Sequence, residues 1–216
     1  MRLGAIVLCG GSSTRMGMPK ADLLFGDETM LARVVRRLSE VASPIVVVTA
    51  HGQTPPTLAT PCRFAADARP NRGPLEGLAA GLRAIAADAD AVYATSCDAP
   101  LLVPAFVQAL ADRLAVADAA VPCDGQFAHP LSAVYRTGVL AAVNRMLAAG
   151  RLRTTDLLDE IAARRISVDE LRAADPRLDS LRNLNRPEDY LAALAESGFT
   201  PPPELLMNLR RAASST

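Results

Sequence analysis

The stretch LGAIVLCGGSSTRMGMPK, from Leu3 to Lys20, is the part of the chain that decides the fold. Its first half is an apolar run of the kind that forms a buried β-strand. Its second half is a glycine-rich loop that carries two cations, Arg15 and Lys20. Closely spaced glycines such as Gly10 and Gly11 let backbone N–H groups converge on an anion, because glycine tolerates the dihedral angles of a concave turn. We therefore expect a strand that leads into a phosphate-binding loop.

This loop matches neither of two common phosphate-binding motifs. It lacks the Gly-Lys-Ser/Thr ending of a Walker A motif, and its glycine spacing differs from the Gly-x-Gly-x-x-Gly of a Rossmann dinucleotide site. The remaining pattern is typical of a nucleotidyltransferase. The alternative is that the glycines only allow a tight passage from strand to helix. Arg15 and Lys20 have no evident folding role in so short a loop, and they favour the phosphate site.

Length and composition predict one well-buried domain. The chain has 216 residues, half of them apolar, and can bury a core without disulfide bonds or a structural metal. We expect this domain to span residues 1–199. Residues 200–216 begin with a threonine and three prolines and have little to bury, so we expect a loosely packed or mobile tail.

Charge and cysteine content disfavour several classes of protein. The 23 basic and 23 acidic residues balance, so no global field attracts nucleic acid or an anionic membrane. The four cysteines lie far apart without a Cys-x-x-Cys pair, which disfavours a zinc site or a disulfide framework and favours the cytoplasm. No uncharged apolar segment without proline approaches the ~20 residues that span a membrane.

Apolar, β-rich runs alternate with segments of helical periodicity, which predicts an α/β domain. We expect a Rossmann-like, three-layer α/β/α fold of the nucleotidyltransferase type with a mostly parallel sheet. Turn residues at 122–125 predict an antiparallel excursion from the parallel core. The expected strands are 3–8, 45–49, 63–66, 91–96, 119–121 and 131–135, and the expected helices are 30–41, 75–86, 104–115, 137–148, 154–164 and 187–195.

Asp98 is the candidate metal ligand. Ligands of open α/β sheets bind beyond the carboxyl ends of the strands, and Asp98 follows the expected strand 91–96. A single carboxylate can suffice for Mg²⁺, because this ion keeps water and substrate phosphates as its other ligands. The alternative is a turn or helix N-cap aspartate ahead of Pro104.

The loop 69–78 is a candidate nucleoside site. Its prolines make the backbone rigid, and Gly73 and Gly77 allow it to pass close to a ligand. Gly73-Pro74 could also simply begin a helix, although this would not explain Gly77 one turn later. Asp67, just upstream, could accept a hydrogen bond from a base or a ribose, or could be an exposed turn residue.

Several later polar residues are candidates for binding a second, anionic substrate. Asn183 and Asn185 occupy alternate positions, which point the same way in an extended segment, although Asn185 could instead cap a helix. His129 could line a cleft or lie at the surface. Arg151 and Arg153 could meet an anion or be solvated at a helix start.

Five segments of the chain, 8–20, 73–78, 97–100, 124–130 and 183–189, follow the order of motifs in the molybdenum cofactor guanylyltransferases. The resemblance to this family extends to about Leu194. Many nucleotidyltransferases share the first motif. Gly-Pro-Leu-x-Gly, Cys-Asp-x-Pro, Asp-Gly…His-Pro and Asn-x-Asn-x-Pro-Glu together favour this family over cytidylyltransferases of isoprenoid or sugar pathways.

The resemblance implies a reaction and a set of site residues. Such enzymes transfer GMP from GTP to the terminal phosphate of molybdopterin with Mg²⁺ and release pyrophosphate. By position, Leu8, Cys9 and Gly10 would line the guanine pocket through their backbone, Lys20 would contact the phosphates, and Asp67 would contact the nucleoside. We further assign Gly11, Thr49, Gly73, Pro74, Gly77 and Asp98 to the nucleotide, Asp98 and Asn185 to the metal, and His129, Arg151, Arg153, Asn183 and Asn185 to the acceptor.

Two positions depart from the family pattern and bear on the choice between GTP and CTP. Thr49 stands where the family often has an asparagine, and Cys9 stands where it usually has an alanine. A cytidylyltransferase of the same cofactor and a sugar-phosphate nucleotidyltransferase therefore remain alternatives within the enzymes.

The expected chemistry needs no protein nucleophile. An acceptor phosphate oxygen attacks the α-phosphorus, and Arg15, Lys20 and a magnesium ion on Asp98 offset the charge of the leaving group, so these three residues are the catalytic candidates. A non-catalytic molybdopterin carrier is the alternative from another class, although such a carrier would not need a metal carboxylate beside a phosphate lysine. An apo-molybdoenzyme or its chaperone would be a further partner.

Overall fold

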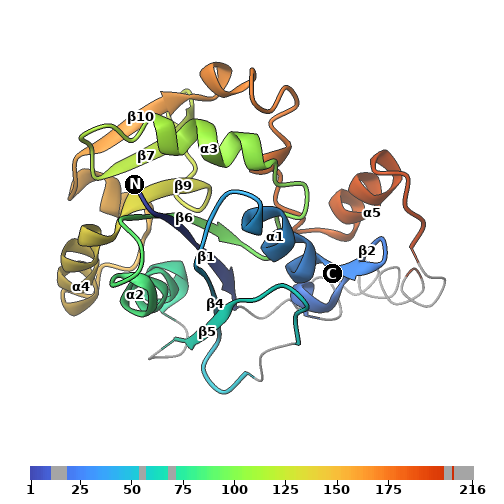
Figure 1. Ribbon diagram of the computed structural model, residues 1–216, viewed down its shortest axis with the longest axis horizontal. Helices are drawn as coiled ribbons and strands as arrows, with labels where there is room; N and C mark the ends of the chain where they lie inside the picture. Colours follow the sequence, from blue (N-terminus) through green and yellow to red (C-terminus); the bar gives the residue numbers. More distant parts are fainter. Residues whose placement is uncertain (11–18, 54–56, 68–71, 202–205, 207–216) are drawn as a thin grey trace.

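The computed structural model describes residues 1–10, 19–53, 57–67, 72–201 and 206. Figure 1 shows a central sheet with helices on both of its faces. The strands are β1 (Leu3–Cys9), β2 (Leu24–Phe25), β3 (Glu28–Thr29), β4 (Ile45–Thr49), β5 (Arg63–Ala66), β6 (Ala91–Ser96), β7 (Ala119–Asp124), β8 (Phe127–Ala128), β9 (Ala133–Arg136) and β10 (Ala163–Ser167). The α-helices are α1 (Met30–Ser39), α2 (Gly73–Ile85), α3 (Pro104–Asp112), α4 (Leu140–Ala148) and α5 (Pro187–Glu196).

The central sheet has the strand order β10-β7-β9-β6-β1-β4-β5, and β8 pairs with β7. Parallel pairing joins β6, β1, β4 and β5, and also joins β10 to β7. β9 lies antiparallel between β6 and β7. The prediction of a mostly parallel sheet with an antiparallel excursion is therefore confirmed.

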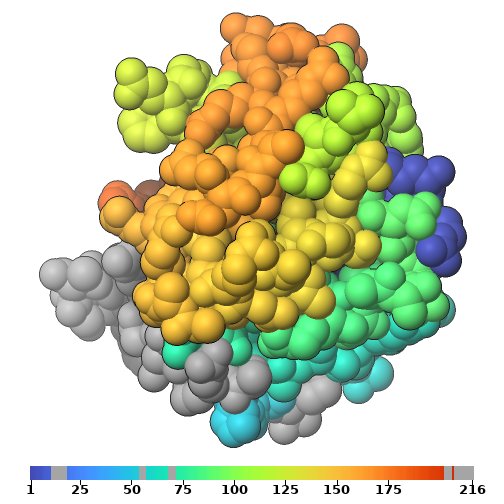
Figure 2. All heavy atoms as spheres, turned by 90° about the vertical axis from the view of Figure 1, so that its left-hand side faces the viewer, coloured from blue at the N-terminus to red at the C-terminus, as the bar shows by residue number. Residues whose placement is uncertain are grey.

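Alternate side chains of β1 enter two separate hydrophobic layers. Ala5 and Val7 pack into one layer with residues of α1 and α3. Ile6 and Leu8 pack into the other layer with residues of α2 and α4. Because both faces of the sheet are covered, its central strands are apolar along most of their length and become polar only at their carboxyl ends. Figure 2 shows the side on which α2 and α4 pack together, with the β10 segment above them.

The prediction of a helix over residues 154–164 is wrong. A short 3₁₀ helix, Thr155–Asp159, replaces it and is followed by β10, which pairs with β7. Leu157 and Leu158 are buried and supplied the helical signal. The sequence did not predict β10, because this edge strand has the sequence ARRIS, in which Ile166 is the only fully buried side chain.

The predicted turn at 122–125 lies further along the chain. Pro122 and Cys123 still belong to β7, and the turn falls at Gly125 and Gln126. Gly125 has a φ of +57°, a left-handed conformation that glycine adopts without strain. Pro122 is tolerated within the strand, where its carbonyl accepts a hydrogen bond from the N–H of His129 at 2.9 Å.

A third, smaller hydrophobic cluster joins the β2-β3 hairpin to α5, which lie side by side in Figure 1. Phe25, Met30, Leu184 and Tyr190 are among its buried members. The hydroxyl of Tyr190 also donates a hydrogen bond to the backbone carbonyl of Leu24. This cluster brings residues 23–30 and 184–199 together beside the sheet.

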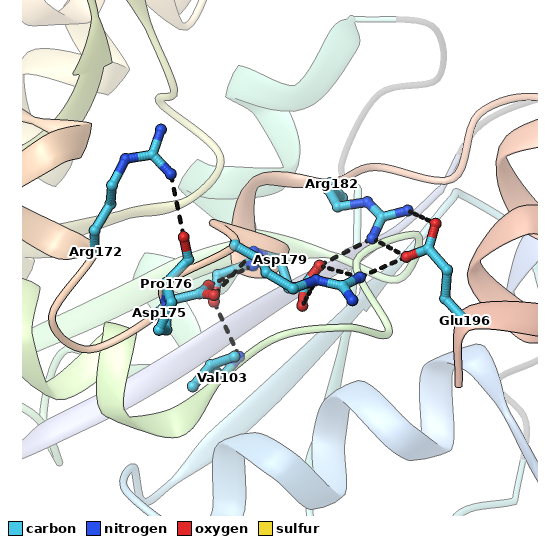
Figure 3. A network of polar contacts seen from close by, with 9 residues as sticks. Val103, Arg172, Asp175, Pro176, Asp179, Arg182 and Glu196 are labelled. Carbon is cyan, nitrogen blue, oxygen red and sulfur yellow. Dashed lines mark hydrogen bonds and ion pairs between the residues drawn. The ribbon is translucent and has the colours of Figure 1, made fainter. Parts of the chain in front are cut away.

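A polar network links the segment before α5 to α3 (Figure 3). The carboxylate of Asp175 accepts hydrogen bonds from the N–H groups of Asp179 and Ser180 at 3.0 and 2.8 Å. The hydroxyl of Ser180 accepts from the N–H of Val103, the residue that precedes α3, at 2.9 Å. Arg182 then bonds both Asp179 and Glu196, the last residue of α5. The network therefore fixes the path of the chain between β10 and α5.

Parts of three predictions lie outside the described residues. These are Gly11 and Arg15 of the glycine-rich loop, most of the expected tail 200–216, and part of the loop 69–78. Within the described ranges, no helix has the length and apolar character needed to cross a membrane.

The close packing of α2 on β1 depends on Gly81. A Cβ atom at this position would lie 2.5 Å from Cγ2 of Ile6, whose side chain is fully buried. Gly81→Ala should lower the free energy of unfolding by about 1–3 kcal/mol, because a packed core takes in an extra methyl group only by shifting. Urea denaturation of the purified protein measures this change.

Gly138 provides the matched control. Nothing lies within 4 Å of a Cβ atom built on Gly138, so Gly138→Ala should stay within about 0.5 kcal/mol of the wild type. Similar losses in both variants would show that the contact between Gly81 and Ile6 does not limit the packing.

Candidate active site

The candidate residues gather at one edge of the sheet because four neighbouring strands end there. β6, β1, β4 and β5 are parallel, so their carboxyl ends lie side by side. Asp98 follows β6, Gly10 follows β1 and Asp67 follows β5. Asp67 donates its N–H to the carbonyl of Thr49 at 3.1 Å, which joins the ends of β4 and β5. The structure thus brings together the described residues that were expected to bind the nucleotide from these strands.

Lys20, Asp98 and Asn185 form the polar cluster of this site. Nζ of Lys20 donates to Oδ2 of Asp98 at 2.8 Å and to Oδ1 of Asn185 at 2.6 Å. The side chains of Lys20 and Asp98 are only 17% and 12% exposed, so water screens their ion pair weakly. One ammonium group therefore joins three segments that lie far apart in the sequence.

The backbone holds two members of the polar cluster together. The carbonyl of Asp98 accepts a hydrogen bond from the N–H of Leu184 at 2.8 Å. Leu184 is buried in the third hydrophobic cluster, so its neighbour Asn185 is anchored beside Asp98. The hydroxyl of Ser96 donates to Oδ1 of Asp98, the oxygen that Lys20 leaves free. Ser96 was not predicted, although its place two residues before Asp98 at the strand end was a signal.

Two arginines of α1 hold the turn that follows Asp98. Nε of Arg33 donates to the carbonyl of Pro100 at 3.0 Å, and Nε of Arg37 donates to the carbonyl of Leu102 at 3.2 Å. The two arginines lie one helical turn apart and so face the same way. Sequence analysis missed them, because arginines on an amphipathic helix usually indicate its solvated face.

The structure excludes the capping alternatives for Asp98 and Asn185. The N-cap of α3 is Val103, and the N-cap of α5 is Arg186, neither of which makes a side-chain capping bond. Asp98 and Asn185 instead direct oxygen atoms toward Lys20. Their positions therefore have no explanation in helix capping.

Asp67 packs closely against Gly77, the glycine of α2 that faces the end of β1. Oδ1 of Asp67 is buried without a hydrogen-bond partner in the part of the chain that the structure describes. A Cβ atom at Gly77 would lie 3.2 Å from this oxygen and 3.0 Å from Cδ2 of Leu8. A larger residue at Gly77 would press on both groups. A buried acceptor without a partner is costly, and a ligand with a hydrogen-bond donor could satisfy it.

A second carboxylate affects the ionisation of Asp67. Glu76 lies on α2 with 1% of its surface exposed, and its Oε2 is 3.8 Å from Nε of Arg72. Arg72 is held in turn by the carbonyl of Leu147, to which its Nη2 donates at 2.8 Å. Burial, and then repulsion from Glu76, raise the pKa of the Asp67 carboxyl above its ordinary value of 3.8.

Cys9 and Thr49, the two departures from the family pattern, are register partners on β1 and β4. Both are buried. The hydroxyl of Thr49 donates to the carbonyl of Ala65 at 3.4 Å. A hydrogen bond with the Cys97 thiol lowers the pKa of Cys9 and raises that of Cys97.

The residues expected to bind the acceptor are less closely grouped. Arg151 pairs with Glu160, and the carbonyl of Leu152 lies 3.9 Å from a Cβ built on Gly73, so this segment passes the beginning of α2. Asn183 is exposed, and its carbonyl accepts from the N–H of Asn185 at 3.1 Å. Among the described residues, no hydrogen bond or ion pair links His129, Arg151 or Arg153 to the polar cluster. Partial burial lowers the pKa of His129.

The polar cluster fits a hard divalent cation. Asp98 and Asn185 offer oxygen atoms that already converge on one positive charge, the ammonium group of Lys20. Mg²⁺ needs only one or two protein oxygens when phosphate and water complete its octahedron. The described ranges contain no group of three or more His, Cys, Asp or Glu residues that could hold a metal by themselves.

The raised pKa of Asp67 predicts a pH-dependent effect of Asp67→Asn. The folded protein binds the Asp67 proton more tightly than the unfolded chain, so ionisation of Asp67 lowers stability as pH rises from 3.8 through the raised pKa. The Asp67→Asn variant has no carboxyl group to ionise at this position, so it does not lose this stability as pH rises. Its free energy of unfolding should therefore gain on that of the wild type between pH 4 and pH 7, as measured by urea denaturation. A difference that is constant with pH would exclude ionisation as its cause.

Comparison with known proteins identifies relatives over most of the chain. A family model described as "MobA-like NTP transferase domain" matches residues 5–164. A "probable molybdenum cofactor guanylyltransferase" of Chloroflexus aggregans is 35% identical over 207 residues, which cover 93% of this chain and 97% of that protein. A protein of the same name from Mycobacterium avium is 37% identical over 203 residues, which cover 91% and 97%.

Solved structures share the fold at lower identity. Molybdopterin-guanine dinucleotide biosynthesis protein A from Archaeoglobus fulgidus has a TM-score of 0.73 and 22% identity, covering 92% of this chain and 99% of that chain. The 2-C-methyl-D-erythritol 4-phosphate cytidylyltransferase from Thermus thermophilus has a TM-score of 0.66 and 15% identity, covering 90% and 98%. These similarities show a common α/β architecture.

Proposed function

Because the chain belongs to the MobA-like NTP transferase family, we propose that it transfers GMP from GTP to the terminal phosphate of molybdopterin and releases pyrophosphate. The observation that carries this proposal is the polar cluster at the carboxyl ends of the parallel strands. It combines a cation for phosphate oxygens with two oxygen ligands for a metal ion. A carrier of molybdopterin would need neither.

Positioning and electrostatics supply the catalysis. An oxygen of the molybdopterin phosphate attacks the α-phosphorus of GTP in line, and pyrophosphate leaves on the opposite side. Lys20, with Arg15 and the amides of Gly10 and Gly11, would bind the phosphates and offset the charge that builds on the leaving group.

Asp98 and Asn185 are the residues that would hold the metal ion. Nucleotidyltransferases of this family typically use a divalent metal. We assign Mg²⁺ here, which when bound would neutralise phosphate charge. Ser96 would keep the carboxylate of Asp98 oriented, because it donates to the oxygen that Lys20 leaves free.

Asp67 favours GTP over CTP as the nucleotide. The Watson–Crick edge of guanine presents two adjacent donors, N1–H and N2–H, which suit a carboxylate, whereas cytosine presents one amino donor beside an acceptor. Oδ1 of Asp67 is buried and able to accept such a bond. The backbone of Leu8, Cys9 and Gly10 would form the adjacent wall, and Thr49, Gly73, Pro74 and Gly77 would complete the pocket.

The acceptor would bind through donors beyond the nucleotide site. We assign this role to His129, Arg151, Arg153, Asn183 and Asn185, which can bind phosphate and polar groups without competing for Mg²⁺. A further proposal is that the product passes to an apo-molybdoenzyme or its chaperone in the cytoplasm.

The decisive assay mixes the purified protein with molybdopterin, Mg²⁺ and either GTP or CTP. GTP should yield pyrophosphate and the guanine dinucleotide cofactor, and CTP should yield much less of either product. A preference for CTP would support a cytidylyltransferase of the same cofactor. Tight binding of molybdopterin without any turnover would support a carrier.

Asp98→Asn should abolish turnover and leave the fold intact. The substitution keeps the shape of the side chain but removes the negative charge of the polar cluster, which would attract the metal ion, and Asp98 does not cap a helix. Product formation should fall at least about 100-fold at saturating Mg²⁺. Circular dichroism and thermal melting provide the control. Substantial activity, or a collapse of stability, would return Asp98 to a structural role.

Replacing Arg151 and Arg153 together by alanine should weaken binding of the acceptor and spare binding of GTP. Exposed arginines contribute modestly, so the loss should amount to about 1 kcal/mol. Arg151 also pairs with Glu160, and Glu160→Gln controls for loss of that pair alone. Guanylation rates against molybdopterin concentration, together with calorimetry of GTP, measure both effects. A change confined to GTP would assign the arginines to the nucleotide.

A further inference from the structure

We propose that Lys20 competes with the metal ion for Asp98 and Asn185, so that the metal binds tightly only after a nucleotide triphosphate has drawn Lys20 away. This inference rests on the proposed function, since it assumes that the same two oxygens serve as metal ligands. It gives Lys20 a role beyond contact with phosphate. Lys20 would make metal binding depend on the presence of the nucleotide.

The contacts of Lys20 leave no room for a cation on the same oxygens. Its Nζ lies 2.8 Å from Oδ2 of Asp98 and 2.6 Å from Oδ1 of Asn185. A magnesium ion binds oxygen at about 2.0–2.1 Å, so an ion on these two atoms would lie close to the position of the ammonium nitrogen. Two like charges cannot share that position, and one of them must leave.

The other carboxylate oxygen does not offer an easy alternative. Oδ1 of Asp98 already accepts a hydrogen bond from the hydroxyl of Ser96. Leu184 fixes the backbone on the far side of the same residue by donating to its carbonyl. Asp98 is therefore held with Oδ2 toward Lys20, and rotation of the carboxylate would break a bond.

Burial of the Lys20–Asp98 ion pair makes the competition strong enough to measure. The side chains of Lys20 and Asp98 are 17% and 12% exposed. Hydrogen bonds between charged groups in such surroundings are worth more than exposed ion pairs, whose median contribution is small. A metal ion without nucleotide must break both contacts of the ammonium group and leave it without a carboxylate.

A triphosphate removes this obstacle because it offers Lys20 other anionic oxygens. The lysine stem has several rotatable bonds, so the ammonium group can swing without a change in the backbone. Once Lys20 binds phosphate, Asp98 and Asn185 become free for the metal, which binds phosphate too. Coupling between two ligands is reciprocal, so the metal should strengthen nucleotide binding by the same factor.

The test measures Mn²⁺ binding without nucleotide, by the loss of the electron paramagnetic resonance signal of free Mn²⁺. Lys20→Met should bind Mn²⁺ about tenfold more tightly than the wild type, because no ammonium group has to be displaced. Lys20→Gln tests the same change with a polar side chain. With saturating GTP, after correction for Mn²⁺ bound to free GTP, the wild type should gain more affinity than Lys20→Met.

Arg186→Met is the matched control for charge. Arg186 follows Asn185 directly, its side chain is 68% exposed, and its ion pair is with Glu188 at 3.7 Å. Removing this cation changes the nearby charge as Lys20→Met does but frees no ligand oxygen. Mn²⁺ affinity should change by less than about twofold, because exposed charges are well screened. Equal gains in both variants would mean that net charge alone governs Mn²⁺ binding, and would overturn the proposal.

Asp98→Asn in the Lys20→Met background separates this inference from the proposed function. Loss of Mn²⁺ binding there identifies Asp98 as the ligand. If Asp98 is the ligand but Lys20→Met binds Mn²⁺ no better than the wild type, the competition is wrong and the metal assignment stands. If the double variant still binds Mn²⁺ tightly, both the metal assignment and the competition fail. The guanylation assay tests the transfer reaction independently of either result.

Discussion

The contact of one ammonium group with two oxygens, from residues 78 and 165 positions away, is the interaction on which the candidate site depends. Each partner reaches this point by a different route. Asp98 follows the end of β6, Lys20 lies in the chain that leads into the β2-β3 hairpin, and Asn185 lies in the segment before α5. The third hydrophobic cluster packs the segments that carry Lys20 and Asn185 against each other, so it holds these two side chains within reach of Asp98.

The sheet provides the other half of this arrangement. Four adjacent parallel strands end at one edge of the sheet. Residues that follow different strands therefore lie close together in space although they are far apart in the sequence. The same geometry separates two environments along that edge. At β6 the carboxylate of Asp98 meets a cation, whereas at β5 the carboxylate of Asp67 meets burial and a second acid, Glu76. Opposite surroundings make one carboxylate suited to a cation and the other to a neutral hydrogen-bond donor.

The sequence predicted the buried parallel strands, because their apolar runs carry the signal in themselves, and its motifs predicted the family, which the comparisons confirm. It failed at β10, where Arg164 and Arg165 occupy an edge strand and the buried leucines before it imitate a helix. Asp98 was found because it follows a strand. The hydrogen bond between Lys20 and Asn185 depends on long-range packing, so no local sequence pattern predicts it. Arg33 and Arg37 were missed for the same reason, since their carbonyl partners lie on another segment.

The exposed arginines of β10 also affect how molecules behave toward one another. A strand at the end of a sheet presents unpaired backbone groups to any other extended chain, and this is a common route to aggregation. Arg164 and Arg165 are both exposed on this outermost strand, and Arg164 is bonded to the carbonyl of Arg113. A second molecule that added a strand here would have to pack against the side chains of both arginines, of which Arg165 is also paired with Asp159 at 3.8 Å. The feature that hid β10 from sequence analysis thus helps to keep the sheet from growing between molecules at high protein concentration.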